Sequence, residues 1–122
     1  MARILLSGGT GLLGRNLLKL LPDIAAPSHQ EMDITDAESI RFAVAEHKPD
    51  IFIHGAALVG TGVCAADPER CRRVNVLGTE NVSDACEAEG VRLVFISTNY
   101  VYDGEIGNYS ESIDSFKRVE LL

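Results

Sequence analysis

The sequence predicts an α/β fold in which a doubly wound parallel sheet carries helices on both faces. Three observations support this expectation. Four short apolar runs have the length of buried strands, helical repeats of apolar residues separate them, and the links between them are short. Because strands that alternate with helices form parallel sheets, the pattern corresponds to about half of such a fold, truncated after about four strands.

The first half of the pattern starts with a strand over residues 3–7, an apolar run that ends at two glycines. A helix is expected over residues 12–21, where leucines recur at helical spacing until Pro22 stops the helix. Residues 24–28 are the least regular of the four strand candidates. Together these elements predict a β-α-β start.

A capping box marks the start of the second helix. Thr35 offers a hydroxyl at the cap position, and Glu38 offers a carboxylate three residues later. The apolar positions 40, 43 and 44 share one face of this helix, which is expected to end near Pro49. The apolar, β-branched run over residues 50–57 then predicts a strand covered on both faces.

The last helix is expected to be the longest. Asp67 would cap it, Pro68 suits its first turn, and Gly90 supplies its end. Residues 91–97 are expected to form the fourth strand, and no repeat, low-complexity tract or interdomain linker interrupts the pattern. The predicted order is therefore β-α-β-α-β-α-β.

Composition excludes several classes of protein. The 122 residues (13.2 kDa) suit one domain, and 11 Lys and Arg against 18 Asp and Glu give a net charge of -7, which argues against nucleic-acid binding. No apolar stretch approaches the roughly 18 residues that span a bilayer, and no export signal is expected. Cys64, Cys71 and Cys86 form no Cys-x-x-Cys pair and no metal-binding pattern, so we expect reduced thiols, no metal and a cytoplasmic protein.

Gly8, Gly11 and Gly14 form a G-x-x-G-x-x-G run between the first strand and the first helix. The first glycine permits a tight turn, the second lets a pyrophosphate approach the backbone, and the third lets helix and strand pack closely. The free N–H groups at the helix N-terminus would face the phosphates. A tight turn requires glycine in any case, but the position after a strand and before a helix favours a dinucleotide site.

Five segments in order along residues 3–111 extend this pattern: ILLSGGTGLLG, EMDITD, IFIHGAA, VNVLGTENV and FISTNYVYDG. With them the sequence resembles the extended short-chain dehydrogenase/reductase family, and within it the dTDP-4-dehydrorhamnose reductase type. The resemblance implies a Rossmann-type NAD(P)-binding domain over residues 1–111, then a divergent stub over residues 112–122 in place of a substrate-binding lobe. It also implies an oxidoreductase of nucleotide-sugar metabolism, in dTDP-rhamnose biosynthesis.

The resemblance assigns the cofactor-binding residues as well. The pyrophosphate would be held by six residues of the glycine turn: Gly8, Thr10, Gly11, Leu12, Leu13 and Gly14. The adenine would be bordered by Asp33 and Ile34, and the nicotinamide ribose would lie against Ala56, Ala57 and Leu58. The simpler alternatives are a turn carboxylate at Asp33 and close packing of the sheet at the alanines.

Two further residues are carried over after the fourth strand. Thr98 matches the family's catalytic Ser/Thr, whose hydroxyl would bind and polarise the carbonyl oxygen of the substrate. Asn99 would also contact the substrate, although an aspartate is common at that place in the family. The family's proton-transferring Tyr-x-x-x-Lys pair is absent from the 122 residues, so these residues alone are not expected to run the family's reaction by the family's mechanism.

The end of the second strand bears on the choice of cofactor. An NAD-preferring fold of this type often has a carboxylate there, which binds the ribose hydroxyls and repels a 2′-phosphate. Residues 27–30 contain no acid, and the first one is Glu31. We therefore expect NADP or NAD as cofactor, with a slight preference for NADP.

These observations give a leading hypothesis and two alternatives. The leading hypothesis is the NAD(P)-binding portion of a nucleotide-sugar reductase that transfers hydride to a 4-keto sugar nucleotide. The alternatives are an epimerase or dehydratase of the same family, and a catalytically inactive NAD(P)-binding module. The expected partners are a nicotinamide dinucleotide, a nucleotide sugar only if a longer chain exists, and, because the last strand has an open side, further copies of the chain. Neither nucleic acid nor a membrane is expected as a partner.

Other polar residues have simpler interpretations. His54 is expected to be a packed or hydrogen-bonded core residue. Asn75, in VNVLGTEN, is expected to tie the long helix to the sheet. Arg70, Arg72 and Arg73 are expected to lie on solvated helix surfaces.

Overall fold

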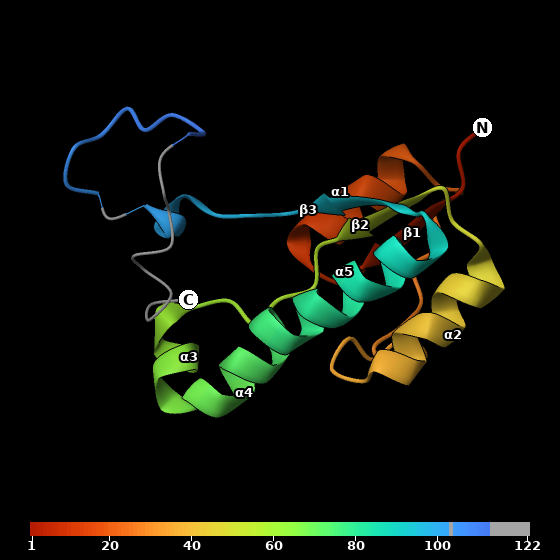
Figure 1. Cartoon of the computed structure of the whole chain (residues 1–122), viewed down its shortest axis with the longest axis horizontal. Coiled ribbons are helices and arrows are strands. Elements are labelled where there is room, and N and C mark those ends of the chain that lie inside the picture. The colour runs from red at the N-terminus through yellow and green to blue at the C-terminus, as the bar shows by residue number, and fades with distance from the viewer. Residues whose placement is uncertain (103, 113–122) are drawn as a thin grey trace.

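The computed structural model describes residues 1–102 and 104–112, and it builds them around a parallel sheet (Figure 1). Strand β1 (Ile4–Ser7) pairs with β2 (Ile51–His54), which pairs with β3 (Arg92–Phe95), in the order β1-β2-β3. All pairs are parallel, so the three strands end at the same edge of the sheet. The α/β class with a parallel sheet is confirmed.

The expected strand over residues 24–28 is reduced to a single bridge between Leu5 and Ala25. The N–H of Leu6 donates to the carbonyl of Ala25 (2.8 Å), and the N–H of Ala25 donates to the carbonyl of Ile4 (3.0 Å). These bonds lie on the side of β1 that faces away from β2. The bridge does not extend because Pro27 has no N–H to donate to a ladder. The prediction of a full strand here is wrong, although its place beside β1 is kept.

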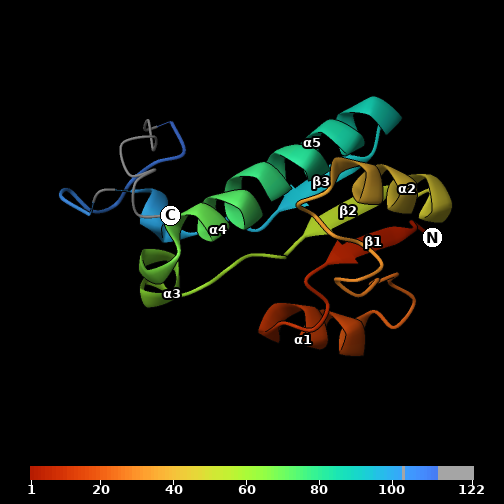
Figure 2. The same cartoon turned by 90° about the horizontal axis from the view of Figure 1, so that it is seen from below.

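Helices cover both faces of the sheet, as expected. Figure 2 shows α1 (Leu12–Leu20) on one face and α2 (Ala37–His47) and α5 (Gly78–Glu89) on the other. The side chains packed between the sheet and the layer of α2 and α5 are apolar: Leu5, Ile40, Val44, Phe52 and Val82. This layered core fixes the strand ends, where the groove described below is formed.

The N-cap of α2 is Asp36 and not Thr35. The Asp36 carboxylate accepts the N–H of Glu38 (3.0 Å), whereas the hydroxyl of Thr35 donates to the Asp33 carboxylate (2.7 Å). The helix cap therefore lies one residue later than the capping box predicts, because Asp33 engages the Thr35 hydroxyl. The helix ends as expected, with Lys48 in the left-handed region (φ 43°) immediately before Pro49.

The long helix expected after Asp67 is divided into three parts. It consists of α4 (Pro68–Arg72), a π-helical turn η1 (Arg73–Leu77) and α5. The Asp67 carboxylate caps it by accepting the N–H of Arg70 (3.0 Å), and Gly90 ends it at φ 66°. Both ends are thus confirmed, whereas the π-helical turn was not expected; such turns are frequent at functional sites.

A short helix that the sequence did not predict, α3 (Thr61–Ala66), precedes α4. The chain turns back at Asp67 between the two helices, which brings Cys64 and Cys71 together in a disulfide with a Cα–Cα distance of 5.1 Å. Cys86 is a free, buried thiol, and burial raises its pKa to about 11. The expectation of three reduced thiols is therefore wrong for Cys64 and Cys71.

The segment after β3 lies away from the layers of helix and sheet (Figure 1). After β3, the chain leads away from the sheet (Figure 1) into a short 3-10 turn, η2 (Asn99–Val101). Residues 113–122, which make up most of the expected stub over 112–122, lie outside the described residues. In the part of the chain that the structure describes, no helix is long and apolar enough to cross a membrane.

Candidate functional site

A groove of about 640 Å³ lies at the edge of the sheet where β1 and β2 end. Its walls are built from the glycine turn, the segment after the Ala25 bridge, the loop after β2 and one side of the long helix. In numbers, these are residues 7–11, 26–29, 31–35 and 55–58, with Arg70, Arg73 and Val74. The carboxyl ends of strands in a doubly wound sheet are where such folds bind ligands.

The glycine turn is shaped by contacts that exclude side chains. Gly8 has φ 81°, and a Cβ there would lie 2.7 Å from the carbonyl carbon of Gly55 and 2.8 Å from the amide nitrogen of Ala56. The turn therefore packs directly on the loop after β2. A Cβ on Gly14 would lie 2.2 Å from the carbonyl oxygen of Gly8 and 2.6 Å from the Cα of Gly9, so only glycine lets α1 approach the turn this closely.

Eight of the cofactor-binding residues expected from the sequence line this groove: Gly8, Thr10, Gly11, Asp33, Ile34, Ala56, Ala57 and Leu58. The other three, Leu12, Leu13 and Gly14, do not. Leu12 and Leu13 are exposed on the first turn of α1, and Gly14 is buried beneath the glycine turn. Gly14 therefore acts on the shape of the groove through packing.

Thr98 and Asn99 are not among the residues that line the groove. Thr98 caps η2, and its hydroxyl oxygen accepts the N–H of Tyr100 (3.2 Å). Both residues follow β3 (Arg92–Phe95) in the sequence, on the segment that leads away from the sheet. The structure thus does not bring the expected catalytic and substrate residues together with the expected cofactor residues.

The loop after β2 is clamped by Asn75, which lies in η1. The N–H of Leu58 donates to Asn75 Oδ1 (2.7 Å), and Asn75 Nδ2 donates to the carbonyl of Leu58 (3.0 Å). We expected Asn75 to tie the long helix to the sheet. Its side chain instead ties the helix to Leu58, in the loop that forms the wall of the groove.

His54 connects the sheet, the groove and α5 through a buried chain of hydrogen bonds. Its Nδ1 lies 2.7 Å from Ser7 Oγ, and its Nε2 lies 3.0 Å from Thr79 Oγ1. The Thr79 hydroxyl donates to the carbonyl of Asn75 (2.7 Å), so it must accept from Nε2–H. Nδ1 is then left to accept the Ser7 hydroxyl, whose oxygen accepts the N–H of Ala56 (3.3 Å).

This series of hydrogen bonds requires a neutral imidazole at His54. His54 is 1% exposed, and desolvation by burial lowers its pKa to about 4. The expectation of a packed, hydrogen-bonded core histidine is confirmed. Through its hydrogen bonds to Ser7 and Thr79, His54 connects the ends of β1 and β2 to α5.

Asp33 is both a turn carboxylate and a residue of the groove. It accepts the N–H (2.9 Å) and the hydroxyl (2.7 Å) of Thr35. Burial acts to raise the pKa of Asp33, but these hydrogen bonds and the nearby charges of His29 and Arg73 outweigh it, and the pKa is lower than its ordinary value. The groove therefore holds a carboxylate anion at neutral pH.

Sequence reasoning missed several charged residues of the groove. Glu31, expected to lie beyond the second strand, lines the groove, and its carboxylate accepts the N–H of Ser28 (2.7 Å). Arg70 and Arg73, expected on a solvated helix surface, are exposed but also line the groove. Their spacing was the available signal, since Arg70, Arg73 and Val74 stand at i, i+3 and i+4 on one helix face.

Known proteins are similar to this chain in sequence and in fold. The family model described as RmlD substrate binding domain matches residues 2–116. The dTDP-4-dehydrorhamnose reductase of Streptomyces griseus is 36% identical over 109 residues, which are 86% of this chain and 36% of that protein. The methionine adenosyltransferase 2 subunit beta of Xenopus tropicalis is 29% identical over 120 residues, which are 89% of this chain and 36% of that protein.

The solved structures give the same result for the fold. The dTDP-4-dehydrorhamnose reductase of Bacillus anthracis, in complex with NADP, matches with a TM-score of 0.81 at 32% identity, over 85% of this chain and 39% of that one. The sequence resemblance to this reductase type is confirmed. The chain spans little more than a third of the length of the curated relatives that it matches.

Proposed function

Because the chain belongs to the RmlD substrate binding domain family, we propose that it is the NAD(P)-binding part of a nucleotide-sugar reductase. The whole protein would transfer hydride from NADPH or NADH to the 4-keto group of a dTDP-linked sugar. The observation that carries this proposal is the single groove of about 640 Å³ that unites the glycine turn, Asp33 and the loop after β2. Its volume is in the range of sites that hold cofactors.

The residues of the groove suit the parts of a dinucleotide. The N-cap residue of α1 is Gly11, which has no side chain to cap the helix, so the N–H groups of the first turn are left to bind a pyrophosphate. Ile34 and Val74 give an apolar place for the adenine, beside the anionic Asp33. The loop after β2, clamped by Asn75, gives a rigid wall for the nicotinamide ribose.

The bound cofactor would supply the hydride. We assign substrate contact to Thr98 and Asn99, and polarisation of the substrate carbonyl to the Thr98 hydroxyl, on the family resemblance alone.

Residues 1–111 would form the dinucleotide-binding domain, and we place the protein in the cytoplasm. The Cys64–Cys71 disulfide is the one feature of the described chain that runs against that location, since disulfides are rare in reducing compartments.

A titration with both cofactors tests the proposal. We expect the full chain to bind NADPH at least as tightly as NADH, followed by the fluorescence of the reduced nicotinamide. Arg70 and Arg73 favour the additional 2′-phosphate, whereas Glu31 opposes it, so the preference is expected to be small. Clearly tighter binding of NADH would reverse the preference, and failure to bind either cofactor would overturn the proposed function.

A second candidate is a module that binds NAD(P) without turnover. The similarity to methionine adenosyltransferase 2 subunit beta, named as the subunit of another enzyme, supports it. An assay of the full chain with NADPH and a dTDP-4-keto sugar separates the two. Consumption of NADPH that depends on the sugar supports the reductase, and tight binding without consumption supports the module. Conversion of the sugar without net consumption would indicate an epimerase or dehydratase.

The open side of β3 suggests self-association. Val94, Phe95 and Ile96 are 39%, 52% and 44% exposed, and within the described residues β3 pairs only with β2. An apolar edge of this kind invites pairing with another chain. We expect a dimer or larger species by light scattering at high concentration, and dissociation when Val94→Lys places a charge there. A clean monomer would count against this assembly.

A further inference from the structure

Two arginines line the groove from the long helix. Arg70 lies in α4, and Arg73 is the first residue of η1. Within the described part of the chain, neither guanidinium takes part in an ion pair or a side-chain hydrogen bond. Arginine is charged at every pH at which the protein folds, so the groove contains two cations that form no ion pair with the described residues.

These cations stand near the carboxylates of the same groove. Its ionisable lining residues are His29, Glu31, Asp33, Arg70 and Arg73. The charge of Arg73 is one of the causes that lower the pKa of Asp33, which places its guanidinium within electrostatic reach of that carboxylate. The two arginines therefore offset the two carboxylates, which alone would repel a phosphate.

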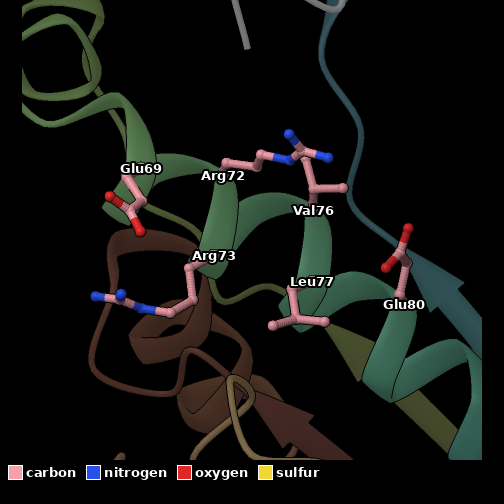
Figure 3. Close-up of a pocket in the computed structure, with 6 residues that line it drawn as sticks. All are labelled: Glu69, Arg72, Arg73, Val76, Leu77 and Glu80. Carbon is pink, nitrogen blue, oxygen red and sulfur yellow. The ribbon is translucent and has the colours of Figure 1, made fainter.

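The neighbouring arginine does not share this position. Figure 3 shows the side chains of Arg72 and Arg73 pointing away from each other across the helix. Arg72 lines a separate, smaller cavity of about 340 Å³, together with Glu69, Val76, Leu77 and Glu80. Arg73 lines both cavities, whereas Arg72 is not part of the groove.

We propose that Arg73, together with Arg70, binds a phosphate group of the dinucleotide from the helix side of the groove. This inference rests on the proposed function. A planar guanidinium binds phosphate oxygens through two parallel hydrogen bonds, which unpaired arginines at a groove wall are able to supply. The phosphate is either the 2′-phosphate of NADP or the pyrophosphate common to NADP and NAD, and both present the same anionic oxygens.

Three matched variants of the full chain test the proposal: Arg73→Gln, Arg70→Gln and, as the control, Arg72→Gln. The dissociation constants for NADPH and NADH are measured for each variant at low and at moderate salt. Loss of a charge-assisted hydrogen bond costs about 1.5–3 kcal/mol, so Arg73→Gln is expected to weaken binding by about 10-fold or more. Arg72→Gln is expected to bind within about twofold of the wild type.

The two cofactors identify the phosphate. If Arg73→Gln weakens only NADPH binding, the contact is to the 2′-phosphate; if it weakens both equally, the contact is to the pyrophosphate. In either case the loss is expected to shrink as salt rises, because salt screens an exposed charge. Arg73→Lys, which keeps the charge and loses the planar fork, is expected to give an intermediate loss and serves if the glutamine variant does not fold.

Wild-type affinity in Arg73→Gln, with the wild type itself binding, would overturn this inference and leave the proposed function standing. If the wild type binds neither cofactor, the proposed function fails first. Equal losses in Arg73→Gln and Arg72→Gln would also overturn the inference, because they would reflect the net charge of the helix and not a contact in the groove.

Discussion

Replacing Gly14 by alanine is expected to lower the free energy of unfolding by about 3 kcal/mol, the upper end of the usual range for overpacking. The added Cβ would lie 2.2 Å from the carbonyl oxygen of Gly8 and 2.6 Å from the Cα of Gly9. Both are backbone atoms, so relief requires a shift of the whole glycine turn or of α1. Because residues 8 and 9 line the groove, the same shift is expected to weaken binding of NADPH.

Gly62 in α3 provides the matched control. A Cβ there meets nothing within 4 Å, so Gly62→Ala adds the same methyl group to a helix without a clash. It is expected to leave stability unchanged or to raise it by up to about 1 kcal/mol, since alanine favours helix. Urea unfolding of both variants decides the matter. A Gly14→Ala protein as stable as Gly62→Ala would show that α1 does not depend on this contact.

The sequence predicted the parts of the fold and site that depend on local signals. The glycine spacing located the turn between β1 and α1, and Asp67 and Gly90 located the ends of the long helix. Each of these signals acts within a few residues, through a left-handed glycine or a side-chain cap. Such local signals can be predicted from the sequence without knowledge of the tertiary structure. The expectation for Asp33, which lines the groove, came from the family resemblance and not from a local signal.

Features that depend on distant parts of the chain were not predictable. The Cys64–Cys71 pair requires the reversal between α3 and α4, and the π-helical turn η1 interrupts a sequence pattern that favours one continuous helix. The Ala25 segment had the composition of a strand but only one bonded position before Pro27. In each case the result is set by how elements pack against one another, which apolar periodicity does not encode.

The pH dependence of stability offers a test of the His54 chain of hydrogen bonds. The pKa of His54 is lowered to about 4 in the fold, from an ordinary value of 6.5. Between these pH values the unfolded chain binds a proton that the folded protein does not, so the free energy of unfolding falls as the pH falls from 6.5 toward 4. At about 1.4 kcal/mol per pKa unit, the full loss is about 3 kcal/mol, and this contribution is constant below pH 4.

The carboxylates act in a different pH range. Glu31, Asp33 and Asp50 have lowered pKa values in the fold, and their ordinary values are 4.5, 3.8 and 3.8. Their contribution to stability is present above those values and is lost as the pH falls below them toward the lowered pKa values of the fold. Unfolding measured between pH 7.5 and 5 therefore separates His54 from these carboxylates, and about 2 kcal/mol of the His54 contribution is expected to be lost over that interval.

His54→Gln is expected to remove this pH dependence, because glutamine does not titrate. His47→Gln, on the last turn of α2, is the matched control and is expected to keep it. The physical reason is burial, which disfavours the charged imidazolium. A proton on Nδ1 would also deprive the Ser7 hydroxyl of its acceptor, and the oxygen of that hydroxyl accepts the N–H of Ala56 at the wall of the groove. If wild type and His54→Gln lose the same stability between pH 7.5 and 5, then His54 is not held neutral, and its Nδ1 does not accept the Ser7 hydroxyl.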